Sequence, residues 1–174
     1  MKTLKILLVV AAILAIVGIF LPHDYKVSRE LVMRAPVMAI QQHVADMDNW
    51  TKWTVWEETT PPAGKRPPQM ESGIGSGLYF SGNAGSGWFV ITDNSGVDGF
   101  AYVVFSSSGD KSKANVTFTD LGAETKVSWM VAGSVSKPPV LAPYLAISKE
   151  FLVGLSLSQN LKNLKKLVEQ EDRG

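Results

Sequence analysis

The 174-residue sequence contains no cysteine and only two histidines, His23 and His43. Without cysteine it offers no disulfide, no thiol nucleophile and no thiolate ligand for a metal. Two isolated histidines without the spacing of a helical zinc motif give no reason to expect a zinc or iron site. The sequence therefore predicts no metal and no other cofactor.

An excess of either charge is also missing, because 17 Lys and Arg stand against 16 Asp and Glu, a formal net charge of +1. This balance gives no electrostatic reason to expect a nucleic acid as the partner. The chain is 45% hydrophobic, and its length suits one folded domain with a sizeable core.

Charge is absent altogether from residues 6–21, a run of sixteen apolar residues that follows Lys2 and Lys5 and ends before Pro22. As a helix this run would be about 24 Å long, slightly short of the ~30 Å hydrocarbon core of a bilayer. Its all-round apolar composition also excludes an ordinary core helix, which would have a polar face.

The same charged start and apolar middle occur in a cleaved signal peptide, but the small residues of a cleavage site are not present around Gly18. We therefore expect residues 1–22 to be a retained signal anchor, a single-pass transmembrane helix in the cell membrane. Lys2 and Lys5 should stay in the cytoplasm, which places residues 23–174 on the extracytoplasmic, periplasmic side.

Beyond Pro22 the pattern changes, and residues 25–33 alternate loosely as a strand would. Ala35 and Pro36 then open a helix. Its apolar stripe is formed by Val37, Ile40, Val44 and Met47. The segment 59–68 holds four prolines and is expected to be a loop.

The second half of the sequence is rich in β-branched and aromatic runs that end in turn residues, as in an antiparallel meander. A helix over about residues 143–170 closes the chain, and its apolar stripe must lie across the sheet. The layout predicts an α+β fold in which a curved antiparallel sheet grips this helix. The strand runs are 78–83, 87–96, 98–110, 111–124 and 125–135.

Five segments of the sequence are characteristic as a set: APVMAIQQHVADMDNWTKWTVW, GIGSGLYFSGN, GSGWFVIT, GAETKVSW and KEFLVGLSLSQNLKNLKKLVE. With them the sequence resembles the polyketide cyclase/dehydrase-like branch of the SRPBCC superfamily, which includes START and Bet v 1 proteins, over about residues 22–169. The resemblance implies a helix-grip fold, with an apolar cavity between a seven-stranded antiparallel sheet and the long terminal helix. Members bind lipids, sterols, polyketides or other hydrophobic molecules, and a minority catalyse reactions on them.

One departure from the family pattern is Gln41, where a large apolar residue is expected on the first helix. Gln41 and His43 flank the apolar stripe on opposite sides. Each could offer a hydrogen bond to a ligand, or could be a solvated or backbone-paired side chain.

Three of the five tryptophans, Trp50, Trp53 and Trp56, follow one another at a spacing of three. We expect Trp50 to fill the core at the end of the first helix, because a buried indole removes a large area from water. Trp53 and Trp56 are expected at the rim of the cavity, where indoles beside a membrane anchor could enter the interface.

Six glycines between Gly73 and Gly87 resemble a phosphate loop, but a strand follows them where such a loop needs a helix. We interpret them as strand bulges that let the sheet curl. The run 100–105 does not alternate, so Ala101, Val103 and Phe105 would face outward. A partner protein, a second copy or lipid headgroups could cover this face, or it is ordinary apolar scatter.

The sequence thus predicts a membrane-anchored protein that binds a lipid-like or other hydrophobic small molecule in a cavity on the order of a few hundred Å³. A cyclase- or hydratase-type enzyme is one alternative and predicts His43 or a carboxylate facing the cavity; no residue is assigned a catalytic role. A module whose own side chains fill the interior is another. The expected ligand-binding residues are Gln41, Val44, Trp53, Trp56, Phe80, Trp88, Phe100, Tyr102, Val116, Phe118, Trp129, Phe151, Leu155 and Ser158.

Overall fold

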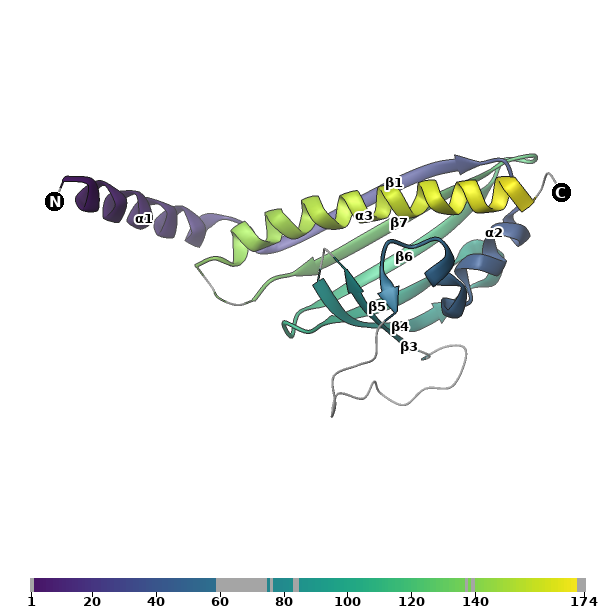
Figure 1. The fold of residues 1–174 in the computed structure, drawn as a ribbon, viewed down its shortest axis with the longest axis horizontal. Helices are drawn as coiled ribbons and strands as arrows, with labels where there is room; N and C mark the ends of the chain where they lie inside the picture. Colours follow the sequence, from purple (N-terminus) through teal and green to yellow (C-terminus); the bar gives the residue numbers. More distant parts are fainter. Residues whose placement is uncertain are drawn as a thin grey trace.

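The computed structural model describes residues 2–58, 75, 77–82, 85–136, 138 and 140–171. Helix α1 (Lys2–Phe20) projects from one end of a domain built from one sheet and the long helix α3 (Ala142–Glu171). In Figure 1 α3 lies along one face of the sheet, and α1 and α3 run in the same general direction. The predicted terminal helix is thereby confirmed to within a residue at each end.

Seven antiparallel strands form the sheet in the order β1-β7-β6-β5-β4-β3-β2. The consecutive strands β3 to β7 make a meander, and β1 returns to pair with β7. The predicted α+β helix-grip fold is therefore confirmed. The strands are β1 (Asp24–Met33), β2 (Glu57–Glu58), β3 (Gly77–Gly82), β4 (Gly85–Asn94), β5 (Gly99–Ser106), β6 (Lys111–Asp120) and β7 (Thr125–Ser134).

Short helices cover one end of the sheet. Helix α2 (Val37–Val44) begins after Pro36, whose extended backbone forms its N-cap, and buries Ile40 and Val44 as predicted. Two 3₁₀ turns, η1 (Met47–Lys52) and η2 (Gly96–Asp98), complete the layer. The Met47 side chain and the proline-rich segment 59–68 lie outside the described residues.

Trp50 occupies the space between the sheet and the helices. Its side chain is 1% exposed, and its indole Nε1 donates a hydrogen bond of 2.9 Å to the Val44 carbonyl. Six aromatic rings surround it with centroid distances of 5.5–5.9 Å, and this set with Trp50 is called the aromatic cluster below. The six are Trp53, Trp56, Phe89, Phe100, Tyr102 and Trp129.

The interpretation of the glycines as bulges is wrong for those that the structure describes. The β3–β4 register is regular from Gly77 to Gly82, and the shift in this part of the sheet falls between Ile91 and Asp93 instead. A Cβ atom at Gly87 would collide with the carbonyl of Phe105 on the next strand. Glycine there permits close approach of two strands.

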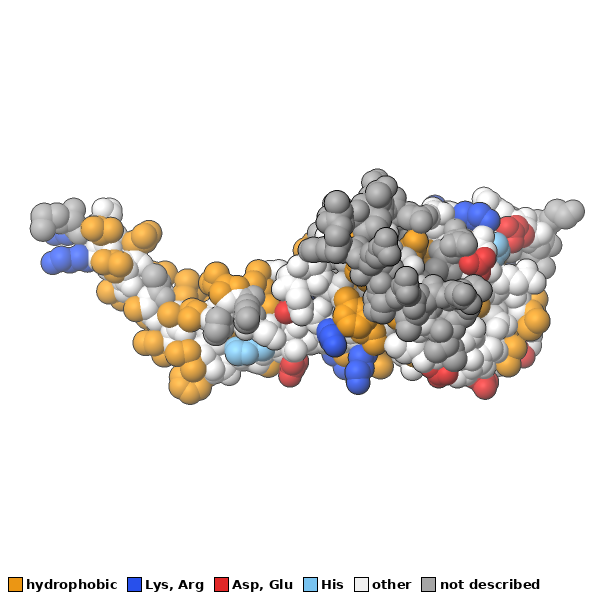
Figure 2. Space-filling model, turned by 90° about the horizontal axis from the view of Figure 1, so that it is seen from below, with side chains coloured by type: hydrophobic (Ala, Val, Ile, Leu, Met, Phe, Trp, Pro, Cys, Tyr) orange, Lys and Arg blue, Asp and Glu red, His pale blue; other side chains and the backbone are white. Residues whose placement is uncertain are grey.

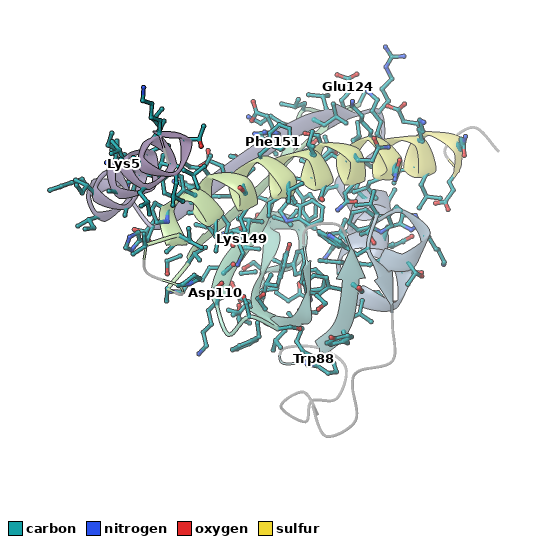
Figure 3. The ribbon with its side chains drawn as sticks, turned by 60° about the vertical axis from the view of Figure 1, so that its left-hand side comes forward. Lys5, Trp88, Asp110, Glu124, Lys149 and Phe151 are labelled. Atoms are coloured by element: carbon teal, nitrogen blue, oxygen red, sulfur yellow. The ribbon has the colours of Figure 1, made fainter. Side chains whose placement is uncertain are left out.

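Asp110, in the turn after β5, joins the sheet to the first half of α3. Its carboxylate accepts hydrogen bonds from Lys149 Nζ at 2.8 Å, Ser108 Oγ at 2.9 Å and the Ser136 amide at 3.3 Å. Figure 3 shows Asp110 in this turn and Lys149 on α3 facing each other. Burial opposes ionisation of Asp110, but the hydrogen bonds outweigh it and hold its pKa below the usual value.

Substituting Trp50→Ala should destabilise the fold by about 3–5 kcal/mol, because it opens a large cavity at the centre of the aromatic cluster. Urea unfolding of the full chain in detergent would measure this. Trp88→Ala is the matched control, since Trp88 is half-buried and contacts Tyr79 on the other face of the sheet. An equal decrease in the free energy of unfolding for the two variants would contradict the assigned role of Trp50.

The Asp110→Asn variant should be less stable than the parent chain at neutral pH, and the difference should disappear in acid. A carboxylate whose folded pKa is depressed adds stability above its unfolded pKa of about 3.9, and loses it as the pH falls through the folded pKa. Melting temperatures between pH 7 and pH 3 would test this. Asp98→Asn, which changes an exposed carboxylate in η2, is the control and should leave the melting temperature at neutral pH nearly unchanged.

Candidate ligand-binding cavity

A partly enclosed cavity of about 60 Å³ lies between α3 and the sheet. Strands β1, β3, β4, β5, β6 and β7 and the segment before β2 contribute to its wall. Its lining is mainly apolar, with hydroxyl groups and one amine. The residues are Tyr25, Trp56, Phe80, Ser86, Phe89, Tyr102, Val104, Ser106, Ser112, Val131, Lys149, Val153, Ser156 and Leu157.

The closed end and the mouth of this cavity differ in chemistry. Phe89, Tyr102 and Leu157 are buried and form an apolar floor. Apart from Trp56, the half-exposed lining residues are mostly polar and come from strands on one side and from α3 on the other. We call them the mouth: Ser86, Val104, Ser106, Lys149, Val153 and Ser156.

Two buried hydrogen bonds fix polar groups in the wall. The hydroxyls of Tyr25 and Ser112 lie 2.5 Å apart, and Trp129 Nε1 donates to the phenol oxygen of Tyr102 at 2.9 Å. Burial raises the pKa of Tyr102, so its phenol stays protonated at any physiological pH. These groups can orient a polar part of a ligand but supply no charge to it.

The cavity is smaller than the few hundred Å³ that the sequence led us to expect. The aromatic cluster explains the difference, because its rings occupy the volume between the curved sheet and α3. A cavity of about 60 Å³ holds a few water molecules, whereas a cavity that binds benzene needs about 150 Å³.

Three of the predicted ligand-binding residues, Trp56, Phe80 and Tyr102, line the cavity. Six others form the core around it instead. Trp53 is 1% exposed, with Nε1 donating to the His43 carbonyl, so its predicted place at the rim is wrong. The six are Val44, Trp53, Phe100, Val116, Phe118 and Trp129.

Phe151, Leu155 and Trp88 point away from the cavity, contrary to the prediction. Phe151 is 67% exposed and Leu155 54% exposed, on the side of α3 that faces away from the sheet. Trp88 contacts Tyr79 on the outer face of the sheet, with ring centroids 5.0 Å apart. Figure 3 shows Phe151 and Trp88 on opposite sides of the molecule.

Gln41 and Ser158 also lie outside the cavity lining. Gln41 is half-buried near Gly96 in η2. Ser158 Oγ donates to the Gly154 carbonyl at 2.8 Å and accepts from Arg29 Nε at 3.2 Å. His43 pairs with Glu171 at the far end of α3, with Nε2 2.8 Å from the carboxylate.

Sequence reasoning missed most of the polar lining. A signal for two of these residues was present, because strict alternation in β1 and β6 turns Tyr25 and Ser112 to the inner face. Ser86 and Ser106 carry no such signal, since they depend on where β4 and β5 begin and end. The apolar outer face at Ala101, Val103 and Phe105 is half-exposed, and a partner for it stays a prediction.

The described lining of the cavity contains neither a carboxylate nor an imidazole, and its titratable side chains are Tyr25, Tyr102 and Lys149. Among the residues that the structure describes, no three His, Asp or Glu side chains gather in a way that could hold a metal ion.

Neither a family model nor a curated protein matches this sequence. Solved structures do match it. A START superfamily protein from Mycobacterium smegmatis is 17% identical, with 84% of this chain and 98% of that one covered and a TM-score of 0.58. Protein CV1439 from Chromobacterium violaceum is 16% identical, with 83% and 98% covered and a TM-score of 0.59.

DynU16, a protein of the dynemicin biosynthetic locus, is 13% identical with a TM-score of 0.58 and is covered over 47% of its own length. That match covers 83% of this chain. At these identities the comparisons establish fold and not activity. The seven-stranded sheet, the long terminal helix and these likenesses agree, and the chain has the same helix-grip fold as these solved structures, one of which is a START superfamily protein.

Proposed function

We propose that the protein is a membrane-anchored binding protein for a lipid-like or other hydrophobic small molecule. The observation that carries the proposal is the amphipathic cavity between α3 and the sheet, which has an apolar floor and a polar mouth. A ligand with an apolar part and a small polar part matches this division.

Burial of the apolar part against Phe80, Phe89 and Leu157 would supply most of the binding free energy, at ~25 cal/mol per Å². The hydroxyls of Ser86 and Ser106 would then fix the orientation of the polar part at the mouth. The resting cavity has room for a small terminal group. A longer apolar chain therefore requires a wall residue to move.

Trp56 is the wall residue best placed to move. It is half-buried, whereas its neighbours Trp50 and Trp53 are each 1% exposed and hydrogen-bonded through Nε1 to backbone carbonyls. The centroid of its ring lies 4.8 Å from that of Phe89 at the cavity wall. Rotation of Trp56 would lengthen the cavity and would remove its ring contacts with Trp50, Phe89 and Trp129. The hydrogen bonds of Trp50 and Trp53 to the backbone would keep those two rings in place.

The anchor in this proposal is α1, which has 19 residues and a mean hydropathy of 2.7 and is apolar enough to cross a membrane. Its length as a helix is about 28 Å, close to the ~30 Å of a hydrocarbon core. Figure 2 shows hydrophobic side chains along α1 and lysines at its N-terminal end. Lys2 and Lys5 favour a cytoplasmic N-terminus and an extracytoplasmic domain.

The enzyme alternative is less well supported. It predicts His43 or a carboxylate directed into the cavity, but His43 lies at the other end of α3 with Glu171. Lys149 is the charged residue in the described lining, and its amine is paired with Asp110.

Native mass spectrometry of the full chain, released from nanodiscs formed with host membranes, tests the proposed function. A reproducible small molecule should be retained by the parent chain and lost from Val153→Phe, which places a large ring in the mouth. Leu152→Phe is the matched control, because Leu152 is 37% exposed and does not line the cavity. Retention by Val153→Phe equal to that of the control would refute the assignment of the cavity.

Trp56→Ala should retain larger hydrophobic molecules than the parent chain, because removal of the indole joins its volume to the cavity. The masses released from the variant and from the parent would be compared in the same nanodiscs. Trp88→Ala, which removes the same ring from the outer face, should leave the retained masses unchanged. An unchanged set of masses in Trp56→Ala would show that this residue does not limit the cavity.

A further inference from the structure

We propose that the first half of α3, residues 142–155, enters the lipid bilayer next to the C-terminal end of α1, reaches the headgroup layer at Leu155, and turns its outer face toward lipid. The inference rests on the proposed membrane anchor, but it concerns a different surface. It explains an exposed apolar face that the cavity does not use.

The contact between α1 and α3 determines how deep in the membrane α3 begins. Tyr144 Oη donates a hydrogen bond of 2.8 Å to the carbonyl of Leu14, inside the apolar run of α1. Gly18, one turn later, is buried against α3: a Cβ atom there would lie 2.8 Å from the Val140 carbonyl and 3.3 Å from the Tyr144 ring. If α1 spans the hydrocarbon layer, the start of α3 must enter it too.

The outer face of this half of α3 is apolar and exposed, and its members are called the outer stripe. Their exposed fractions run from 37% to 67%, although leucine and phenylalanine normally lose such contact with water on folding. They lie on the side of α3 that faces away from the sheet. The outer stripe consists of Leu141, Leu145, Ile147, Phe151, Leu152 and Leu155.

On the same side of α3 the exposed side chains change from apolar to charged after Leu155. Lys162 and Lys166, which follow Leu155 by seven and eleven residues, share its side of the helix and are exposed.

Two polar residues in the first half of α3 are also exposed, Ser148 and Glu150. Ser148 lies within the outer stripe, and its hydroxyl donates a hydrogen bond of 2.9 Å to the Tyr144 carbonyl. Glu150 lies off the outer stripe, four residues before Gly154, and at about 9 Å beyond Tyr144 it is close to the level of Leu21, at the membrane boundary.

The change falls where a membrane boundary would place it. At 1.5 Å per residue, Leu21 lies about 10 Å beyond Leu14 along α1, and Leu155 about 16 Å beyond Tyr144 along α3. Leu155 is then about 6 Å past the end of the apolar run, within a headgroup layer that is roughly 5–8 Å thick. Lys162 is about 17 Å past it, in water.

Two of the first amides of α3 find acceptors within the protein, which is compatible with a lipid environment. The amides of Ala142 and Leu145 donate to the carbonyls of Pro138 and Leu141, at 2.8 and 2.9 Å. Pro143 has no amide hydrogen to satisfy.

A second copy of the chain is the other occupant that an apolar helix face admits. Lipid is favoured because the outer stripe is continuous with α1 and ends at the expected boundary. A dimer interface along α3 would have no reason to stop there, since α3 continues for four more turns to Glu171.

Nitroxide labels at single cysteines test the proposal, since the chain has no cysteine of its own. Ile147→Cys and the control Lys162→Cys would be labelled in the full chain and reconstituted into phosphatidylcholine–phosphatidylglycerol nanodiscs. Ile147 is 58% exposed and lies about 6 Å short of the level of Leu21, inside the hydrocarbon layer. At Ile147 relaxation by oxygen should exceed relaxation by a water-soluble nickel chelate several-fold. At Lys162 the order should be reversed.

A third label at Leu8→Cys, in the middle of α1, separates this inference from the proposed anchor. A lipid signal at Leu8 with a water signal at Ile147 would overturn the inference and leave the anchor standing. A water signal at Leu8 would overturn both. Dipolar broadening at Ile147, from a label on a second copy, would also overturn the inference.

Discussion

Filling the space between a curved sheet and a straight helix is the constraint on which the rest of this structure depends. The sheet bends away from α3, and Trp50 with its six neighbouring rings occupies the resulting volume. The segment 50–56, which contains three tryptophans, is bonded to α2 on one side and to α3 on the other. Trp50 and Trp53 donate to carbonyls at the end of α2, while Asn160 and Asn163 of α3 bond the backbone at Val55 and Trp53. Sheet, α2 and α3 therefore all meet at this segment.

Because aromatic rings fill the middle of the interior, the remaining volume is displaced toward one end. That end is the one where β4 begins, β5 ends and the first half of α3 passes over the sheet. It is also the end from which α1 projects (Figure 1). The position of the cavity is thus a consequence of how the core is packed, and the mouth lies on the side of the domain nearest the proposed membrane.

The sequence predicted the fold well because the fold depends on local patterns. Alternation marks β1, β6 and β7, Pro36 precedes α2, and the stripe of Leu157, Leu161 and Leu164 marks the inner side of α3. The cavity was predicted less well because its lining depends on packing between distant segments.

Phe151 and Leu155 illustrate what a sequence pattern cannot predict about the surroundings of a side chain. Their helical spacing gives an apolar face but does not say whether that face meets protein or lipid. The same limit applies to Trp53 and Trp56, which share a spacing of three, yet only the first is fully buried.

The connection between α1 and the sheet has a consequence for how such a domain can work. Only Leu21, Pro22 and His23 separate Phe20 from β1, and the His23 carbonyl accepts a hydrogen bond from the Val135 amide. Three extended residues span about 10 Å at most. With α1 in the membrane as proposed, a domain tethered this tightly could not swing across a compartment to a second membrane, and its cavity would stay beside the leaflet that holds the end of α1.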